Sequence, residues 1–360
     1  MSLMMDWGRI PTKWAEKKNG HATRVTGNGG PGVTKIALIN NMPDAALEDT
    51  ELQFFELLET AASRIPVHIE LYSLPGLPRG DRAREHLHEF YSSTDELLDR
   101  KFDGVIITGT EPRQPDLRNE PYWSSLTNIF DWAERNTTST VLSCLAAHAG
   151  VLYSDGIARQ PLSDKQFGVF EYKKASDHEL VSGVGGLVRF PHSRWNEVRG
   201  EALTSCGYTV LTESRDAGVD MFVKQKRTSL FVHFQGHPEY VAQTLLKEYR
   251  RDIKRFLRRE RPTYPSMPQG YFDASAKKLL DNFQKNALSD LREELMQSFP
   301  EEALAGTLRN SWHLSATSVY QNWLHYIATK AKGKVFAAMA RVGQGGPAYR
   351  SALAKDWKAT

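Results

Sequence analysis

Residues 138–151 have the sequence TSTVLSCLAAHAGV, in which an apolar strand, Thr138 to Ser143, runs directly into a helix of small residues, Leu145 to Tyr153. Cys144 lies at the junction. A sharp turn between a strand and a helix is the layout of a nucleophile elbow, which lifts a reactive side chain above the edge of a sheet. The stretch therefore predicts an α/β fold with Cys144 at the carboxyl edge of a buried strand.

Upstream of this stretch, strand and helix patterns alternate. Short apolar runs predict strands at Lys35 to Asn41, Val67 to Ser73 and Phe102 to Gly109. Helical spacing covers Asp44 to Arg64 and Pro121 to Arg135. Strands that alternate with helices in this way predict a doubly wound parallel sheet, covered by helices on both faces.

Beyond Gly156 the pattern changes. Val219 to Lys224 and Ser229 to Phe234 alternate and predict antiparallel strands appended to the sheet, and Ala242 to Arg261 predicts a basic helix. We expect the chain to divide into a flexible N-terminal segment (1–33), a catalytic part (34–262), a helical C-terminal extension that packs on the core (263–330) and a peripheral tail (331–360).

The composition is that of a globular protein, with 40% apolar and 25% charged residues in 360. The formal net charge of +3 is too small to indicate a nucleic-acid partner. No apolar run is long enough to cross a membrane, and the N-terminus lacks the apolar core of an export signal. Two cysteines, Cys144 and Cys206, cannot build a disulfide framework. We therefore expect a cytoplasmic protein without nucleic-acid or membrane partners.

Cys144 is the candidate nucleophile. The N-terminus of the following helix would stabilise a thiolate, and the backbone N–H of Leu145 is placed to bind the oxyanion of an attacked thioester or ester. The competing interpretation is an inert, buried cysteine. Cys206 lacks such a setting and is interpreted as structural or exposed.

Gly236-His237-Pro238-Glu239-Tyr240 follows an apolar strand and offers partners for Cys144. A thiol needs a base, and the base needs an orienting group. In an extended turn His237 and Glu239 would point to the same side, although such a pair by itself is more often a surface feature. Combined with an upstream elbow cysteine, the order Cys, His, Glu predicts a catalytic triad. No group of residues has metal-ligand spacing, so we expect neither a metal site nor a bound cofactor.

Several segments resemble the homoserine O-succinyltransferase family, a branch of the class I glutamine amidotransferase-like superfamily. Besides Cys144 and GHPEY, they are Asn41-Met42-Pro43 with Thr50-Glu51, FDGVIITG, Lys165 before Gly168-Val169-Phe170-Glu171, Pro191-His192-Ser193-Arg194, Glu248-Tyr249-Arg250-Arg251-Asp252 and Asn322-Trp323-Leu324. The resemblance implies a flavodoxin-like sheet, with C-terminal helices, and a homodimer.

The resemblance also implies roles for residues. Cys144 would accept an acyl group from acyl-CoA as a thioester, His237 would act as general base, and Glu239 would orient His237. Lys165, Ser193 and Arg251 resemble substrate-binding positions. The activity implied is transfer of the acyl group to the hydroxyl of L-homoserine, a step of methionine biosynthesis, with acyl-CoA as co-substrate.

The sequence departs from the family at the loop after FDGVIITG. In an ungapped register Arg113 falls where the family has glycine in succinyl-CoA users and glutamate in acetyl-CoA users. A positive charge there favours succinyl-CoA, whose acyl group ends in a carboxylate. Arg113 could instead point to solvent or to a CoA phosphate. His148, four residues after Cys144, is interpreted as helix packing that faces away from GHPEY.

Other functions stay open at this point. Acetyl-CoA could replace succinyl-CoA, and serine could replace homoserine as acceptor. A glutamine-hydrolysing enzyme of the amidotransferase type would use the same scaffold. A non-catalytic interaction protein is less compatible with Cys144, His237 and Glu239 together.

Overall fold

The computed structural model describes residues 3–6, 8–19, 23–25, 30 and 32–342. In this part of the chain nine strands form a central sheet in the order β2-β1-β4-β3-β5-β6-β13-β12-β9. Their bounds are β1 (Leu3–Asp6), β2 (Thr23–Val25), β3 (Thr34–Ile39), β4 (Val67–Tyr72), β5 (Gly104–Ile107), β6 (Ser139–Ser143), β9 (Thr209–Val210), β12 (Met221–Lys226) and β13 (Ser229–Phe234).

The centre of this sheet is parallel, as the sequence predicts for β3, β4, β5 and β6. Ser229 to Phe234, expected to be an appended antiparallel strand, is β13 and pairs in parallel with β6. Strands β4-β3-β5-β6-β13 pair in parallel and stand in the order 2-1-3-4-5, counted along the chain, which is the flavodoxin-like order. β12 and β9 extend the sheet by antiparallel pairing. In open α/β sheets of this kind, ligands bind outside the carboxyl ends of the parallel strands.

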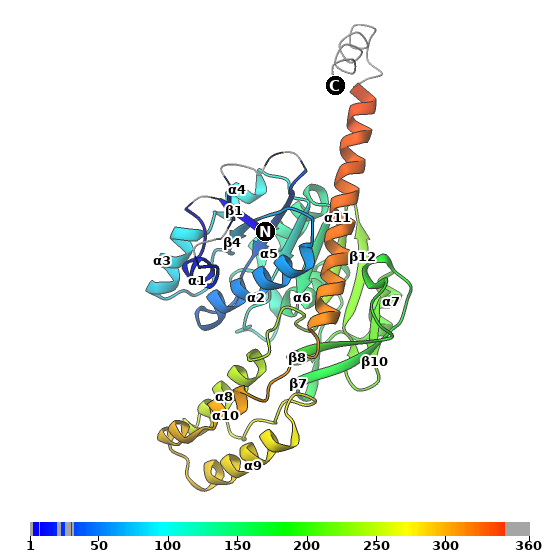
Figure 1. Ribbon diagram of the computed structural model, residues 1–360. Helices are drawn as coiled ribbons and strands as arrows, with labels where there is room; N and C mark the ends of the chain where they lie inside the picture. The colour runs from blue at the N-terminus through cyan, green and yellow to red at the C-terminus, as the bar shows by residue number, and fades with distance from the viewer. Residues whose placement is uncertain (1–2, 7, 20–22, 26–29, 31, 343–360) are drawn as a thin grey trace.

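Helices cover both faces of the sheet (Figure 1). One hydrophobic cluster joins the sheet to α2 (Asp44–Ala62) and α11 (His313–Val342), and a second joins it to α5 (Trp123–Asn136) and α6 (Leu145–Asp155). The other helices are α1 (Thr12–Lys17), α3 (Asp81–Phe90), α4 (Thr94–Leu98), α7 (Gly200–Ser205), α8 (Thr244–Leu257), α9 (Ala274–Ser289) and α10 (Glu301–Ala305), with 3₁₀ turns at Leu117–Asn119, Glu179–Val181 and Glu293–Ser298. None of the helices in the described residues combines the length and the apolar character that a bilayer span requires.

A second, antiparallel sheet was not predicted from the sequence. It has the order β11-β10-β7-β8, and its bounds are β7 (Gln160–Lys174), β8 (Leu187–Glu197), β10 (Thr212–Ser214) and β11 (Gly218–Val219). The first half of β7 is mostly exposed and polar, so it lacks the hydrophobic alternation that would have indicated a strand. Ser193 and Lys165 belong to this sheet.

The structure describes part of each chain end. The described part of the N-terminal segment, expected to be flexible, contains β1, α1 and β2, and β1 pairs in parallel with both β2 and β4. Of the expected peripheral tail, 331–342 continue α11 and 343–360 lie outside the described residues. The boundary between a catalytic part and a helical extension at residue 262 stays a prediction.

The C-terminal helix α11 packs directly on the sheet. Nε1 of Trp323 donates to Oγ of Ser139 in β6 at 3.0 Å. Gly104 of β5 leaves room for the same indole, since a Cβ there would lie 2.8 Å from the Trp323 ring. Just before α11, Nε1 of Trp312 donates to the carbonyl of Tyr240 at 2.7 Å. The C-terminal segment thereby stabilises the GHPEY turn.

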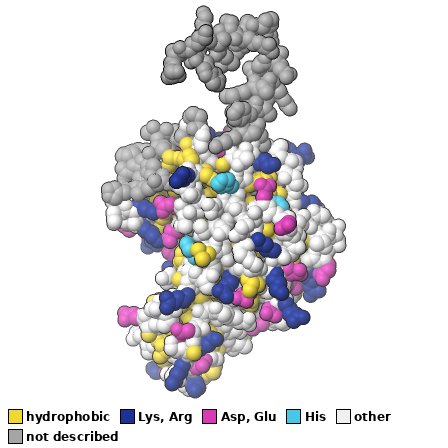
Figure 2. Space-filling view, turned by 45° about the vertical axis from the view of Figure 1, so that its right-hand side comes forward, with side chains coloured by type: hydrophobic (Ala, Val, Ile, Leu, Met, Phe, Trp, Pro, Cys, Tyr) yellow, Lys and Arg dark blue, Asp and Glu magenta, His cyan; other side chains and the backbone are white. Residues whose placement is uncertain are grey.

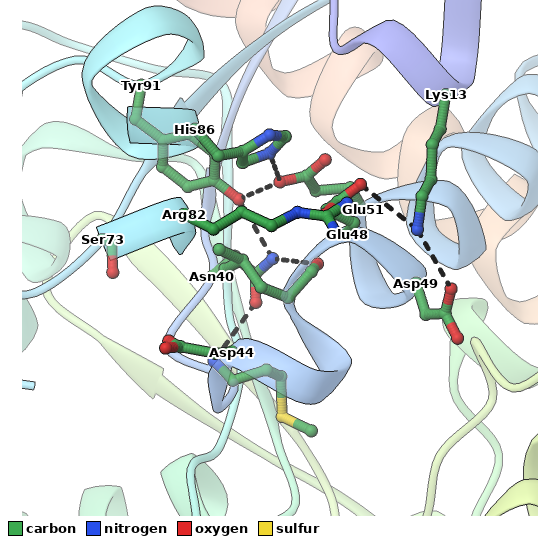
Figure 3. Close-up of polar contacts among 12 residues, drawn as sticks. Lys13, Asn40, Asp44, Glu48, Asp49, Glu51, Ser73, Arg82, His86 and Tyr91 are labelled. Atoms are coloured by element: carbon green, nitrogen blue, oxygen red, sulfur yellow. Dashed lines mark hydrogen bonds and ion pairs between the residues drawn. The ribbon is translucent and has the colours of Figure 1, made fainter. Parts of the chain in front are cut away.

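A buried polar cluster fixes α2 against the segment that ends α3 (Figure 3). Oε1 of Glu51 accepts from Oη of Tyr91 at 2.6 Å and lies 2.7 Å from Nε2 of His86. Nδ2 of Asn40, at the end of β3, donates to Oη of Tyr91 at 3.1 Å. Glu51 belongs to one of the family-like segments, and these contacts give it a structural role.

Candidate active site

Cys144 occupies the strained turn between β6 and α6. Its backbone has φ 52° and ψ −110°, a region that residues other than glycine rarely adopt. Its N–H donates to the carbonyl of Phe234, the last residue of β13, at 2.8 Å. The side chain is half-buried. The predicted elbow therefore exists, and the end of β13 lies directly beside it.

The N–H of Leu145 belongs to the first turn of α6, where amides have no acceptor within the helix. The start of the loop after β5 lies against this turn. A Cβ on Gly109 would come within 3.0 Å of the nitrogen and Cβ of Leu145. A glycine at 109 lets that loop approach the amide proposed for the oxyanion.

His237 and Glu239 form a buried pair. Nδ1 of His237 lies 2.8 Å from Oε1 of Glu239, and Oγ of Ser143 donates to the same oxygen at 3.5 Å. Burial by itself lowers the pKa of His237. The charges of Cys144 and Glu239, with hydrogen bonds from the ring to both side chains, outweigh burial and raise this pKa well above its ordinary value. Cys144, His237 and Glu239 thus form one interacting group.

Backbone hydrogen bonds hold the turn that carries His237. Its N–H donates to the carbonyl of Pro191 at 2.8 Å, and the N–H of Gly236 donates to Oδ1 of Asp220 at 2.7 Å. A Cβ on Gly236 would lie 2.7 Å from Nε2 of His192. Burial raises the pKa of Asp220 to about 7, against the lowering effects of the Gly236 N–H and of Arg194.

Lys165, Ser193 and Arg251 lie together around two carboxylates of α8, those of Glu248 and Asp252. We name these five residues the α8 cluster. Nζ of Lys165 donates to Oδ2 of Asp252 at 2.9 Å, and Oγ of Ser193 donates to Oε2 of Glu248. Nε of Arg251 donates to Oδ1 of Asp252 at 3.0 Å. The Arg251 side chain is 48% exposed and that of Lys165 only 9%. Arg251 can therefore reach a ligand, whereas Lys165 mainly holds the cluster together.

Tyr240 connects the α8 cluster to His237. Its ring stacks on the imidazole with centroids 4.2 Å apart, and its hydroxyl donates to Oε1 of Glu248 at 2.6 Å. No role is predicted from the sequence for Tyr240, Glu248 or Asp252. The helical spacing of Glu248, Arg251 and Asp252, three and four residues apart, was the signal that could have placed them on one face of α8.

Arg113 lies in the loop after β5, and its side chain is exposed. Oε1 of Glu120 accepts from the N–H of Arg113 at 2.5 Å and from the N–H of Gln114 at 2.7 Å, which fixes the backbone of this loop. The guanidinium of Arg113 forms no ion pair with the described residues. It is therefore free to meet a ligand at the surface of the loop.

His148 and Cys206 lie outside the triad. His148 is buried, and burial lowers its pKa to about 3, which fits the expected packing role. Its Nε2 lies 2.9 Å from Oε1 of Gln235, the residue before GHPEY, and the expectation that it faces away from GHPEY itself stays a prediction. Cys206 ends α7, and its carbonyl accepts from Lys224 at 2.8 Å.

One cluster of three side chains in the described residues is compact enough to hold a metal ion. The ligand atoms of Asp6, His68 and Glu70 lie within 4.8 Å of one another, far from the sequence-predicted site residues along the chain. The guanidinium of Arg100 donates to Oε1 of Glu70 at 2.6 Å. Because a cation already occupies the Glu70 carboxylate, the contacts fit an ion-pair network better than a metal centre.

Acidic and basic side chains are interspersed over the face shown in Figure 2, as the small net charge leads one to expect. On that face they do not form a single-sign surface.

Comparison with known proteins identifies the family. Residues 32–333 match the family described as homoserine O-succinyltransferase. The homoserine O-succinyltransferase of Rhodopseudomonas palustris is 41% identical over 83% of this chain and 89% of its own, and that of Methylorubrum extorquens is 40% identical over 82% and 88%.

A solved glutamine amidotransferase from Thermotoga maritima aligns over 83% of this chain and 99% of its own, at 12% identity and a TM-score of 0.41, which is too distant to inform function. The two sequence relatives are 40–41% identical over 82–83% of this chain. The protein belongs to the homoserine O-succinyltransferase family.

Proposed function

We propose that this protein transfers the succinyl group of succinyl-CoA to the hydroxyl of L-homoserine, in methionine biosynthesis, through a thioester on Cys144. The observation that carries the proposal is that Cys144 interacts with the buried His237–Glu239 pair at the carboxyl edge of the sheet. The family membership supports homoserine as the acceptor.

The first half-reaction forms the thioester. The Cys144 thiolate attacks the thioester carbonyl of the donor, and the N–H of Leu145 stabilises the resulting oxyanion. The C–S bond to CoA then breaks, and protonated His237 gives its proton to the departing CoA thiolate. Glu239 keeps the imidazole oriented. The scheme requires no bound cofactor.

The second half-reaction regenerates the enzyme. Neutral His237 accepts the proton of the homoserine hydroxyl while its oxygen attacks the Cys144 thioester. The tetrahedral intermediate expels the Cys144 thiolate and leaves the O-acyl product. His237 is then protonated again, beside a restored thiolate.

The α8 cluster supplies groups for the amino-acid end of homoserine. Arg251 offers a partly exposed guanidinium to the α-carboxylate, which a planar bidentate cation binds well. Ser193 and Lys165 would complete the site, and Glu248 offers a negative charge to the α-ammonium. Tyr240 keeps this cluster in contact with His237.

Arg113 contributes to donor choice in this proposal, because an exposed cation on the loop beside the elbow attracts a succinyl carboxylate. The test of this role is to measure kcat/KM for succinyl-CoA and acetyl-CoA in wild type and in Arg113→Glu. A loss confined to succinyl-CoA supports this role. Equal losses indicate contact with the CoA moiety, and unchanged values for both donors exclude Arg113.

The activity itself is tested by pairing each donor, succinyl-CoA or acetyl-CoA, with each acceptor, homoserine or serine. The proposal expects O-succinylhomoserine as the main product. Faster acetyl transfer would make the enzyme an acetyltransferase, and ammonia release from glutamine without acyl transfer would make it a hydrolase. We also propose a cytoplasmic homodimer, which light scattering of the purified protein tests for its oligomeric state.

A further inference from the structure

Two arginines, Arg194 and Arg159, carry charges that interact with Cys144. Arg194 is 3% exposed, and each of its three guanidinium nitrogens donates a hydrogen bond. Its Nε donates to Nδ1 of His192 at 3.2 Å, and its Nη1 and Nη2 donate to the carbonyls of Asn196 and Ala217, each at 2.8 Å. Arg194 is therefore part of the scaffold.

The guanidinium of Arg159 has fewer hydrogen-bond partners than that of Arg194. It lies between α6 and β7 and is half-buried. Nη2 donates to the carbonyl of Pro115 at 3.3 Å, and among the described residues no carboxylate forms an ion pair with its guanidinium. Most of its donors are consequently available to a ligand.

The carboxylates whose charges act on Arg159 are bound elsewhere. Oε1 of Glu120 accepts from two backbone N–H groups of the loop after β5, and Asp116 binds Arg118 through both oxygens. Burial lowers the pKa of Arg159, although Tyr122, Glu120 and Cys144 act in the opposite direction. The guanidinium of Arg159 is therefore a cation that no carboxylate of the described residues contacts.

The loop after β5 connects this cation to the turn that carries Cys144. At its start, Gly109 lies against Leu145, next to the nucleophile, and further along Pro115 contacts Arg159. The α8 cluster comes from β7, β8 and α8 instead. Arg159 and the α8 cluster therefore belong to separate structural elements.

Thioester formation changes the charge beside Arg159. A free thiolate on Cys144 supplies negative charge to the guanidinium, and acylation removes that charge. A succinyl group carries a carboxylate two methylene groups beyond the thioester carbonyl, so it restores an anion. An acetyl group cannot.

We propose that Arg159 binds the terminal carboxylate of the succinyl group while it is attached to Cys144. This inference rests on the proposed function and adds an inner anion-binding residue to the exposed Arg113. Both arginines flank the same loop, with Arg159 contacting its Pro115 carbonyl and Arg113 exposed upon it.

The test compares Arg159→Gln and Arg159→Lys with the control Arg189→Gln, which changes a half-exposed arginine of β8 that binds Glu171. For each protein, kcat/KM is measured with succinyl-CoA and acetyl-CoA, and the acyl adduct on Cys144 is followed by mass spectrometry. Arg159→Gln should lower kcat/KM for succinyl-CoA by roughly 10- to 100-fold and change acetyl-CoA by less than about threefold, because a charge-assisted pair is lost only with succinyl. Arg159→Lys should recover part of the loss.

Equal losses with both donors, or no loss with either, overturn the inference. If wild type forms no acyl adduct with either donor, the proposed function is wrong, and this result is distinct from a failure of the Arg159 inference alone. A second measurement needs only the wild type: succinamate should slow alkylation of Cys144 by iodoacetamide more than butyramide, which has the same length and carbonyl and lacks the terminal carboxylate. Equal protection by the two compounds would also contradict the inference.

Discussion

Nδ1 of His237 lies 2.8 Å from Oε1 of Glu239, with Pro238 between the two residues along the chain. Both side chains are nearly completely buried. The turn that carries them is held by Pro191 and Asp220 through backbone hydrogen bonds. This pair fixes the orientation of the base relative to Cys144, and the predictions below depend on it.

His237→Ala should slow both acylation and deacylation by roughly 10²- to 10⁴-fold, the range attributed to positioned acid–base groups. Glu239→Gln should cost less, since it keeps the shape and part of the hydrogen bond. Its effect should also depend on pH. Glu239 helps to raise the pKa of His237, so in Glu239→Gln the imidazolium should be lost at lower pH. The rate of Cys144 alkylation against pH measures this shift, and coincident profiles for wild type and Glu239→Gln would refute the pairing.

Gly236→Ala should reduce kcat strongly, because its Cβ would lie 2.7 Å from Nε2 of His192 and 2.9 Å from Oδ1 of Asp220. Relief of this contact requires the turn to move, and His237 moves with it. Gly186→Ala is the matched control, since no atom lies within 4 Å of its added Cβ. We expect at least a tenfold difference in kcat between the two variants. Similar kcat values would show that the turn tolerates displacement.

Asp220 should make stability fall as pH rises. Its pKa is about 7 in the folded protein and 3.8 ordinarily, so between these values the folded state binds more protons than the unfolded state. The free energy of unfolding should therefore decrease from about pH 4 to about pH 7, by up to a few kcal/mol. Asp220→Asn keeps an oxygen for the Gly236 N–H and cannot ionise. Urea midpoints at pH 5 and pH 7.5 should fall less between the two pH values in Asp220→Asn than in wild type; equal changes would contradict the assignment.

Arg251→Gln should raise KM for homoserine roughly 10- to 100-fold, because a hydrogen bond between charged groups typically contributes ~1.5–3 kcal/mol. KM for the acyl donor should change little, since the α8 cluster is proposed to bind the acceptor. Steady-state kinetics with each substrate varied in turn measure both constants. A larger effect on the KM for the acyl donor would show that Arg251 contributes to binding of the donor and not of homoserine.

The parallel core was predictable because its strands are short apolar runs between helical patterns. Phe102 to Gly109 and Thr138 to Ser143 enclose observed strands, Lys35 to Asn41 covers β3 except its first residue, and Cys144 follows β6 as expected. The proximity of Cys144 to His237 followed from chemistry and from resemblance, since the two segments are distant in sequence.

The features that the sequence did not reveal depend on tertiary contacts. β7 is polar along its exposed first half, so only its pairing with β8 makes it a strand. Arg159 is an ordinary surface residue by sequence and becomes notable only through its contact with Pro115 and its position near Cys144. The support of Gly236 by Asp220 likewise joins residues from separate strands.

The most direct measurement is the intact mass of the protein after mixing with succinyl-CoA in the absence of homoserine. Wild type and Cys206→Ser should gain the mass of one succinyl group, mapped to Cys144, and should lose it when homoserine is added. Cys144→Ser and Cys144→Ala should gain no thioester and show almost no transfer. An active Cys144→Ala enzyme, or rapid product formation by wild type without any adduct on Cys144, would contradict the thioester mechanism.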